Sequence, residues 1–104
     1  MIGYRFLSAA EEEMSEAAVF YEAASVSLAR DFLQDVQQVV DTLRSHPELG
    51  ARVDPHLRRA LLHRFPFSLI YAVEVDAILI VSIAHHRRRP KYWKSRIDRP
   101  STKS

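Results

Sequence analysis

The segment that most constrains the fold is Ala77–Ala84, which is apolar throughout except for Ser82. Its isoleucine and valine residues favour an extended strand. In a strand, alternate side chains point to opposite faces, so this segment presents apolar groups on both faces. Such a pattern is typical of a central strand covered on both sides. We therefore expect a sheet with this strand in its interior.

Two earlier segments have helical periodicity. The cleaner one starts near Ser27 and has apolar residues three or four positions apart, at Leu28, Phe32, Val36, Val39 and Leu43. It should end at His46, because a residue that precedes proline avoids the helical region.

The other helix is predicted to begin at Ser8. Ser8 and Glu11 have the spacing of a capping box, in which each side chain binds a free amide at the helix start. Its apolar face would carry Ala10, Met14, Ala17, Tyr21 and Ala24. Only a few residues separate the two helices, so they should form an antiparallel hairpin.

Short apolar and aromatic runs predict further strands over residues 4–7, 59–65 and 67–74. Residues 46–57 contain Pro47, Gly50 and Pro55, and we interpret them as a loop. The order is then strand, helix, helix and three strands. This order predicts a two-layer α+β fold, with the helical hairpin packed on a mostly antiparallel sheet.

A chain of 104 residues is the size of one domain. We assign residues 1–94 to that domain and expect residues 95–104 to form a loose basic tail. No apolar stretch has the length of a membrane span or of a signal-peptide core. There is no cysteine, which excludes disulfides, thiolate nucleophiles and cysteine-bound metals and makes a cytoplasmic location the expectation.

The net charge of +2 conceals a strong asymmetry along the chain. Residues 1–50 carry a net charge of −6 and residues 51–104 a net charge of +8. A solvated tail and an acidic helix face would account for this division. The alternative is that the basic half binds a partner, either nucleic acid or an acidic protein.

Candidate functional residues are concentrated in His85–Lys94, immediately after the predicted central strand. Histidine can transfer protons near neutral pH, and arginine can bind phosphate through two parallel hydrogen bonds. The candidates for target or nucleic-acid binding in this run are Arg87, Arg88, Arg89, Lys91 and Lys94, and those for catalysis are His85, His86 and Tyr92. The aromatic residues Tyr92 and Trp93 could instead anchor the C-terminus on the core.

A second basic cluster lies at Arg58, Arg59, His63 and Arg64. Arg58 and Arg59 would extend the binding surface, unless these charges only protect an edge strand from aggregation.

The sequence does not predict a metal site. His85 and His86 should point to opposite sides of a strand, so they cannot bind one metal ion together. No metal-binding spacing or phosphate-binding glycine loop is present, and we expect no metal or cofactor.

Several of these segments, in this order, resemble the RelE/ParE superfamily of toxins from type II toxin–antitoxin systems. The similar segments are 4–13, Phe20–Glu22, Phe32–Leu33, His46–Pro47, Arg58–Phe67, Ile70–Tyr71 and Ile83–Trp93. The resemblance implies a small cytoplasmic toxin that is neutralised by a cognate antitoxin. RelE-like members cut mRNA on the ribosome, whereas ParE-like members inhibit DNA gyrase without nuclease chemistry.

One position separates these two targets. The RelE-like nucleases have an arginine in an Arg-Leu-Val-Tyr pattern, where this chain has Ser68-Leu69-Ile70-Tyr71. Serine brings no charge to a developing phosphorane, although Arg64 could substitute. The resemblance therefore implies a ParE-like growth inhibitor first. The alternatives are an mRNA endoribonuclease that uses His85, His86, Arg64 and Tyr92, and a protein of this fold without toxicity.

Overall fold

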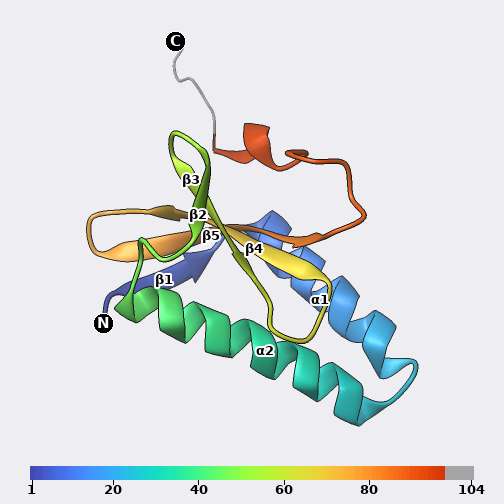
Figure 1. Ribbon diagram of the computed structural model, residues 1–104. Coiled ribbons are helices and arrows are strands. Elements are labelled where there is room, and N and C mark those ends of the chain that lie inside the picture. Colours follow the sequence, from blue (N-terminus) through green and yellow to red (C-terminus); the bar gives the residue numbers. More distant parts are fainter. Residues whose placement is uncertain (98–104) are drawn as a thin grey trace.

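The computed structural model describes residues 1–97 and confirms the predicted α+β fold (Figure 1). The elements in chain order are β1 (Gly3–Phe6), α1 (Ser8–Glu22), α2 (Val26–Ser45), β2 (Ala51–Asp54), β3 (Leu57–Leu61), β4 (Phe67–Val73), β5 (Ala77–His85) and the 3₁₀ turn η1 (Lys94–Arg96). Residues 98–104 of the predicted tail lie outside the described part of the chain.

The five strands form one sheet in the order β1-β5-β4-β3-β2. β1 pairs with β5 in parallel, and the other neighbours are antiparallel. β5 therefore lies between β1 and β4, and residues Ile78–Ala84 are all buried. This confirms the central position predicted from its apolar pattern.

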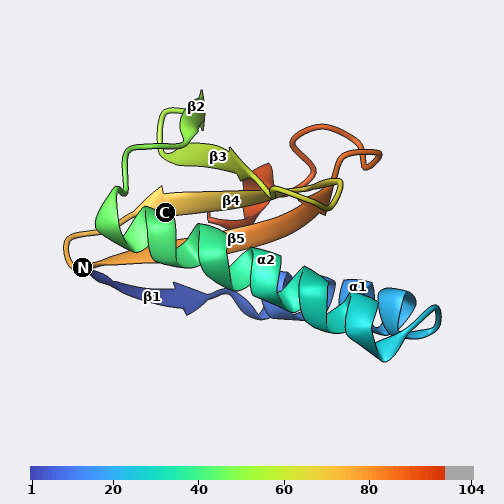
Figure 2. The same ribbon diagram turned by 60° about the horizontal axis from the view of Figure 1, so that its bottom comes forward.

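The helical hairpin covers one face of the sheet (Figure 2). α2 contributes every apolar residue of the predicted stripe, with Phe32, Val36, Val39 and Leu43 buried and Leu28 packed against them. They meet Phe67, Leu69 and Tyr71 of β4 and Ile78, Ile80 and Ile83 of β5 in one apolar cluster. The period of α2 thus fixes which side of the helix faces the sheet.

The opposite face of the sheet is covered by residues 86–97, which we call the C-terminal segment (Figures 1 and 2). Trp93 is only 5% exposed and lies in a second apolar cluster with Leu57, Ile70, Leu79 and Val81. The prediction that aromatic residues anchor the C-terminus is confirmed for Trp93. β5 therefore has its two covering layers, one formed by α1 and α2 and one by the C-terminal segment.

Three local predictions were wrong. Leu7 occupies the N-cap of α1 without a side-chain hydrogen bond, so Ser8 and Glu11 form no capping box. Residues 51–54 form β2, an edge strand, instead of belonging to a loop. β3 spans 57–61 and not 59–65, which leaves His63 and Arg64 in a turn rather than on a strand.

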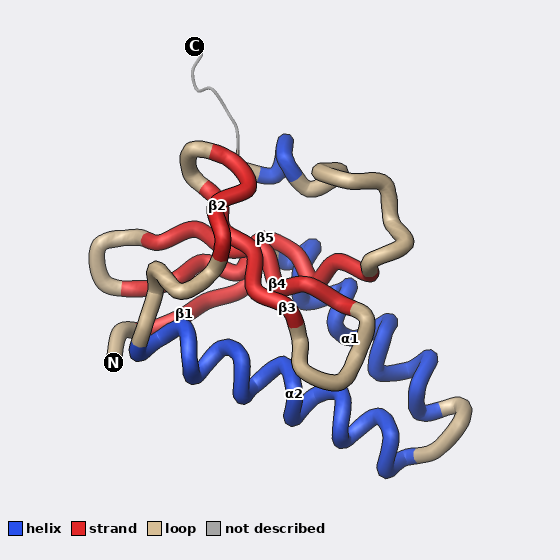
Figure 3. Tube along the Cα trace, viewed as in Figure 1, coloured by secondary structure: helices blue, strands red, loops and turns tan. Residues whose placement is uncertain are grey.

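A buried aspartate explains why β3 ends early. Asp35 of α2 is 3% exposed and accepts backbone hydrogen bonds from His63 N (3.0 Å) and Arg64 N (2.8 Å). Amide groups that a strand partner would have used are thus bound by the helix, and the β3–β4 turn bends toward α2 (Figure 3).

Candidate functional site

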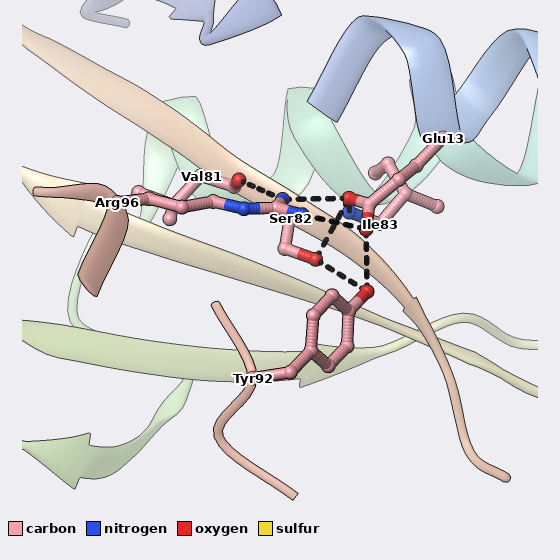
Figure 4. Close-up of polar contacts among 6 residues, drawn as sticks. All are labelled: Glu13, Val81, Ser82, Ile83, Tyr92 and Arg96. Carbon is pink, nitrogen blue, oxygen red and sulfur yellow. Dashed lines mark hydrogen bonds and ion pairs between the residues drawn. The ribbon is translucent and has the colours of Figure 1, made fainter. Parts of the chain in front are cut away.

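The C-terminal segment is attached to the rest of the fold through Glu13 of α1 (Figure 4). Oε1 of Glu13 accepts hydrogen bonds from Ser82 Oγ (2.9 Å), Ile83 N (3.1 Å) and Arg96 (2.9 Å). Oε2 accepts from the Tyr92 hydroxyl (2.5 Å) and from Arg96 (3.0 Å). We call Glu13, Ser82, Tyr92 and Arg96 the Glu13 cluster.

The cluster lies where β5 loses its parallel neighbour. Pairing with β1 ends at Phe6 and Ile80, with one further bond from Leu7 N to Ile80 O. Beyond that point the outward polar groups of β5 need other partners. Glu13 binds Ile83 N, and Arg96 donates to Val81 O at 2.9 Å. The ion pair thus replaces a strand at this edge.

The charges of the cluster stabilise one another. Burial alone would raise the pKa of Glu13, but hydrogen bonds from Arg96, Tyr92 and Ser82 outweigh it, so the pKa lies below the usual 4.5. Burial and the nearby carboxylate raise the pKa of the Tyr92 hydroxyl. The hydrogen bonds to Glu13 raise the pKa of Arg96. Glu13 is therefore a carboxylate and Tyr92 a neutral phenol at neutral pH.

A pocket of about 340 Å³ lies between the C-terminal segment and the sheet. We call it the basic pocket. Arg59 of β3 and Ser68 of β4 line it together with the end of β5. It brings together seven of the residues predicted from the sequence: Arg59, His85, His86, Arg88, Arg89, Lys91 and Tyr92. The sequence clusters at 58–64 and 85–94 are thus partly joined in space.

Ser68 lies under His86 in this pocket. Its hydroxyl is 3.1 Å from His86 Nε2 and the residue is 4% exposed. His85 also borders the pocket, but its ring turns to the other face, where it meets Phe67 edge to face and its Nδ1 accepts a hydrogen bond from Arg87 N (3.0 Å). The prediction that the two histidines point to opposite sides is confirmed.

The other predicted residues do not line the basic pocket. Arg58 donates to the carbonyl oxygens of Glu48 and Gly50. Arg64 lies 3.4 Å from Asp31, Lys94 lies 4.0 Å from Asp54, and Arg87 is exposed. Arg64 therefore faces α2 and is not positioned as a substitute for an arginine at Ser68.

The joint role of Glu13, Ser82 and Arg96 was not predicted from the sequence. Glu13 belongs to a run of three glutamates, Glu11–Glu13, of the kind usual on an exposed helix face. Its position between Ala10 and Ala17, close to the buried face, was the available signal. Ser82 gave a second signal, as the single polar residue in the central strand.

Within residues 1–97, no three histidine, aspartate or glutamate side chains are placed to hold a metal ion. Over the same residues, no helix has the length and apolar character needed to cross a membrane.

Comparison with known proteins gives the chain its family. A search of the curated proteins found no significant match. A solved structure described as the chromosomal ParDE TA system from P. aeruginosa is similar, with a TM-score of 0.71 and 24% identity over 82% of this chain and 96% of that chain. The profile of the family "ParE toxin of type II toxin-antitoxin system, parDE" matches residues 4–90. The chain therefore belongs to the ParE toxin family of type II toxin–antitoxin systems.

Proposed function

We propose that the protein inhibits growth by binding DNA gyrase, and that a cognate antitoxin neutralises it. The family profile and the ParDE match support the toxin–antitoxin assignment. An acidic antitoxin segment would complement the charge of +8 in residues 51–104. Antitoxin and target would then compete for the same basic surface.

The observation that carries the choice of target is Ser68. It occupies the position of the RelE-type arginine, is buried, and pairs with His86 instead of offering a charge. The nearest arginine in sequence, Arg64, is paired with Asp31. Loss of one group that stabilises transition-state charge costs about 2.7–4 kcal/mol of barrier, or a hundred- to thousandfold in rate. This supports binding of a target over RNA cleavage.

We further propose that the exposed cations of the C-terminal segment contact gyrase. Arg87, Arg88 and Arg89 are exposed and the C-terminal segment that carries them is held on the sheet by Trp93 and the Glu13 cluster. A charged, prepositioned surface favours fast and specific association with a macromolecule. His85 at the end of β5, and His86 and Tyr92 in the C-terminal segment, then have positioning roles.

The test is plasmid supercoiling by purified gyrase in the presence of purified toxin. We expect inhibition by the wild type, loss of inhibition in the triple variant Arg87→Ala/Arg88→Ala/Arg89→Ala, and unchanged inhibition in Arg30→Ala. Arg30 is an exposed residue of α2 with no ion pair among the described residues, which makes it a matched control.

Normal supercoiling at excess toxin would exclude gyrase as the target. In parallel, primer extension on induced cells detects mRNA cleavage. Cleavage that disappears in a His85→Ala/His86→Ala variant, together with recovered growth and retained antitoxin binding, would replace the gyrase proposal with a nuclease. Co-purification with the product of a neighbouring reading frame tests the antitoxin independently.

A further inference from the structure

We propose that the basic pocket binds a phosphate group of a nucleotide or a nucleic acid. The proposal goes beyond the toxin's macromolecular target, and its test requires neither gyrase nor a cell.

Positive charge converges on this pocket from separate parts of the chain. Arg59 comes from β3, whereas Arg88, Arg89 and Lys91 come from the C-terminal segment. Within residues 1–97, none of these four has a carboxylate within 4.0 Å, and no aspartate or glutamate lines the pocket. Nearby Lys94 and Arg96 do have acidic partners. The pocket therefore gathers four cations that no carboxylate of the described residues compensates.

The floor of the pocket adds further hydrogen-bonding groups. Ser68 is almost fully buried, and its hydroxyl has the imidazole of His86 as its partner. A polar group in such a floor is costly unless it is hydrogen-bonded. A phosphate has several acceptor oxygens, so it can bind a hydroxyl or imidazole donor and arginine together. The chemistry of the pocket therefore matches an oxyanion.

The backbone that carries these cations is held in a fixed conformation. Lys91 has φ of 62°, a left-handed value that is unfavourable for lysine, and Trp93 two residues later is buried. Arg88 lies 3.8 Å above the ring of Tyr92, whose hydroxyl binds Glu13. Strained, fixed backbone is characteristic of ligand-binding sites, because ordering it in advance lowers the cost of binding.

The size of the pocket limits the ligand. A volume of about 340 Å³ lies at the lower end of the range for small-molecule sites. This space suits one phosphate with an attached sugar. Both a free nucleotide and one unit of a nucleic-acid strand provide that group, and the experiment distinguishes them.

Trp93 lines the pocket and is the single tryptophan of the chain, so its fluorescence reports occupancy directly. The purified toxin is titrated at constant ionic strength with inorganic phosphate, with 5′-AMP, and with an oligothymidylate of about ten nucleotides. We expect a saturable change with 5′-AMP. Oligothymidylate that binds no more tightly than 5′-AMP identifies a nucleotide site. Much tighter, salt-dependent binding of the oligomer identifies a nucleic-acid backbone site.

The variants Arg59→Gln and Arg89→Gln should each weaken binding by about tenfold or more, because each removes charge-assisted hydrogen bonds. Arg30→Gln removes an exposed arginine elsewhere and should leave the affinity unchanged. Circular dichroism checks that each variant is folded. If a variant is unfolded, the titration of the wild type still tests the proposal by itself. The absence of a saturable change with all three probes, or an equal loss in Arg30→Gln, would overturn the proposal.

Discussion

Tyr92 donates a 2.5 Å hydrogen bond from its hydroxyl to Oε2 of Glu13, across 79 positions of sequence. The contact joins α1 to the C-terminal segment over the free edge of β5. The basic residues from Arg87 to Lys94 therefore start from a backbone that α1 holds in place. Anchoring and the proposed contact with the target are thus assigned to different residues of the same short segment.

Removing the charge of Glu13 should destabilise the fold. In Glu13→Gln, Arg96 loses its partner and the donors of Ile83 and Ser82 compete for a weaker acceptor. We expect the free energy of unfolding to fall by about 2–4 kcal/mol, measured by urea denaturation. Glu12→Gln, an exposed neighbour, should change it by less than about 0.5 kcal/mol. Equal effects of the two variants would contradict the role of Glu13.

The same cluster should give stability a definite pH dependence. The folded-state pKa of Glu13 lies below 4.5, so its contribution is fully present above that value and is lost as the pH falls through the folded pKa. The pKa of Tyr92 is raised above 10.0, so its contribution is present below that value and is lost as the pH rises through the raised pKa. Between pH 4.5 and pH 10.0, the melting temperature should change little with pH in both Glu13→Gln and the wild type. Below that range, the melting temperature should fall less steeply with pH in the variant than in the wild type.

Lys91→Gly should separate stability from ligand binding. Glycine adopts the left-handed conformation of this position without the penalty paid by lysine, which is about 1 kcal/mol. The melting temperature should therefore stay the same or rise, whereas phosphate binding in the basic pocket should weaken. Arg89→Gly, at a residue outside the left-handed region, should lower the melting temperature. A lower melting temperature for Lys91→Gly would show that its side chain contributes to folding.

Gly50 should tolerate no side chain. A Cβ atom there would lie 2.6 Å from the hydroxyl of Tyr71, which is fully buried and hydrogen-bonded to both Gly50 N and Pro47 O. Gly50→Ala should therefore cost about 1–3 kcal/mol of unfolding free energy. Gly3→Ala is the control, because its nearest contact would be an ordinary 3.7 Å. Similar costs for the two variants would contradict the steric explanation.

Much of the fold was predictable because its signals are local. The period of α2 identified its buried face, and the apolar run in β5 identified the central strand. The early end of β3 was not local, because it depends on Asp35, 28 and 29 positions before the amides it binds. β2 was missed for the same reason, since this short edge strand is defined by its pairing with β3.

The candidate site likewise has some features that follow from the sequence and others that depend on the tertiary structure. The sequence by itself determined that basic and histidine residues follow the central strand, and that this half of the chain is positively charged. Only the tertiary structure decided that Arg59 joins that group while Arg58 and Arg64 do not. It also decided that one of three consecutive glutamates holds the C-terminal segment. Residue type and periodicity are properties of neighbouring positions, whereas the pairing of charges depends on which distant segments the packed sheet brings together.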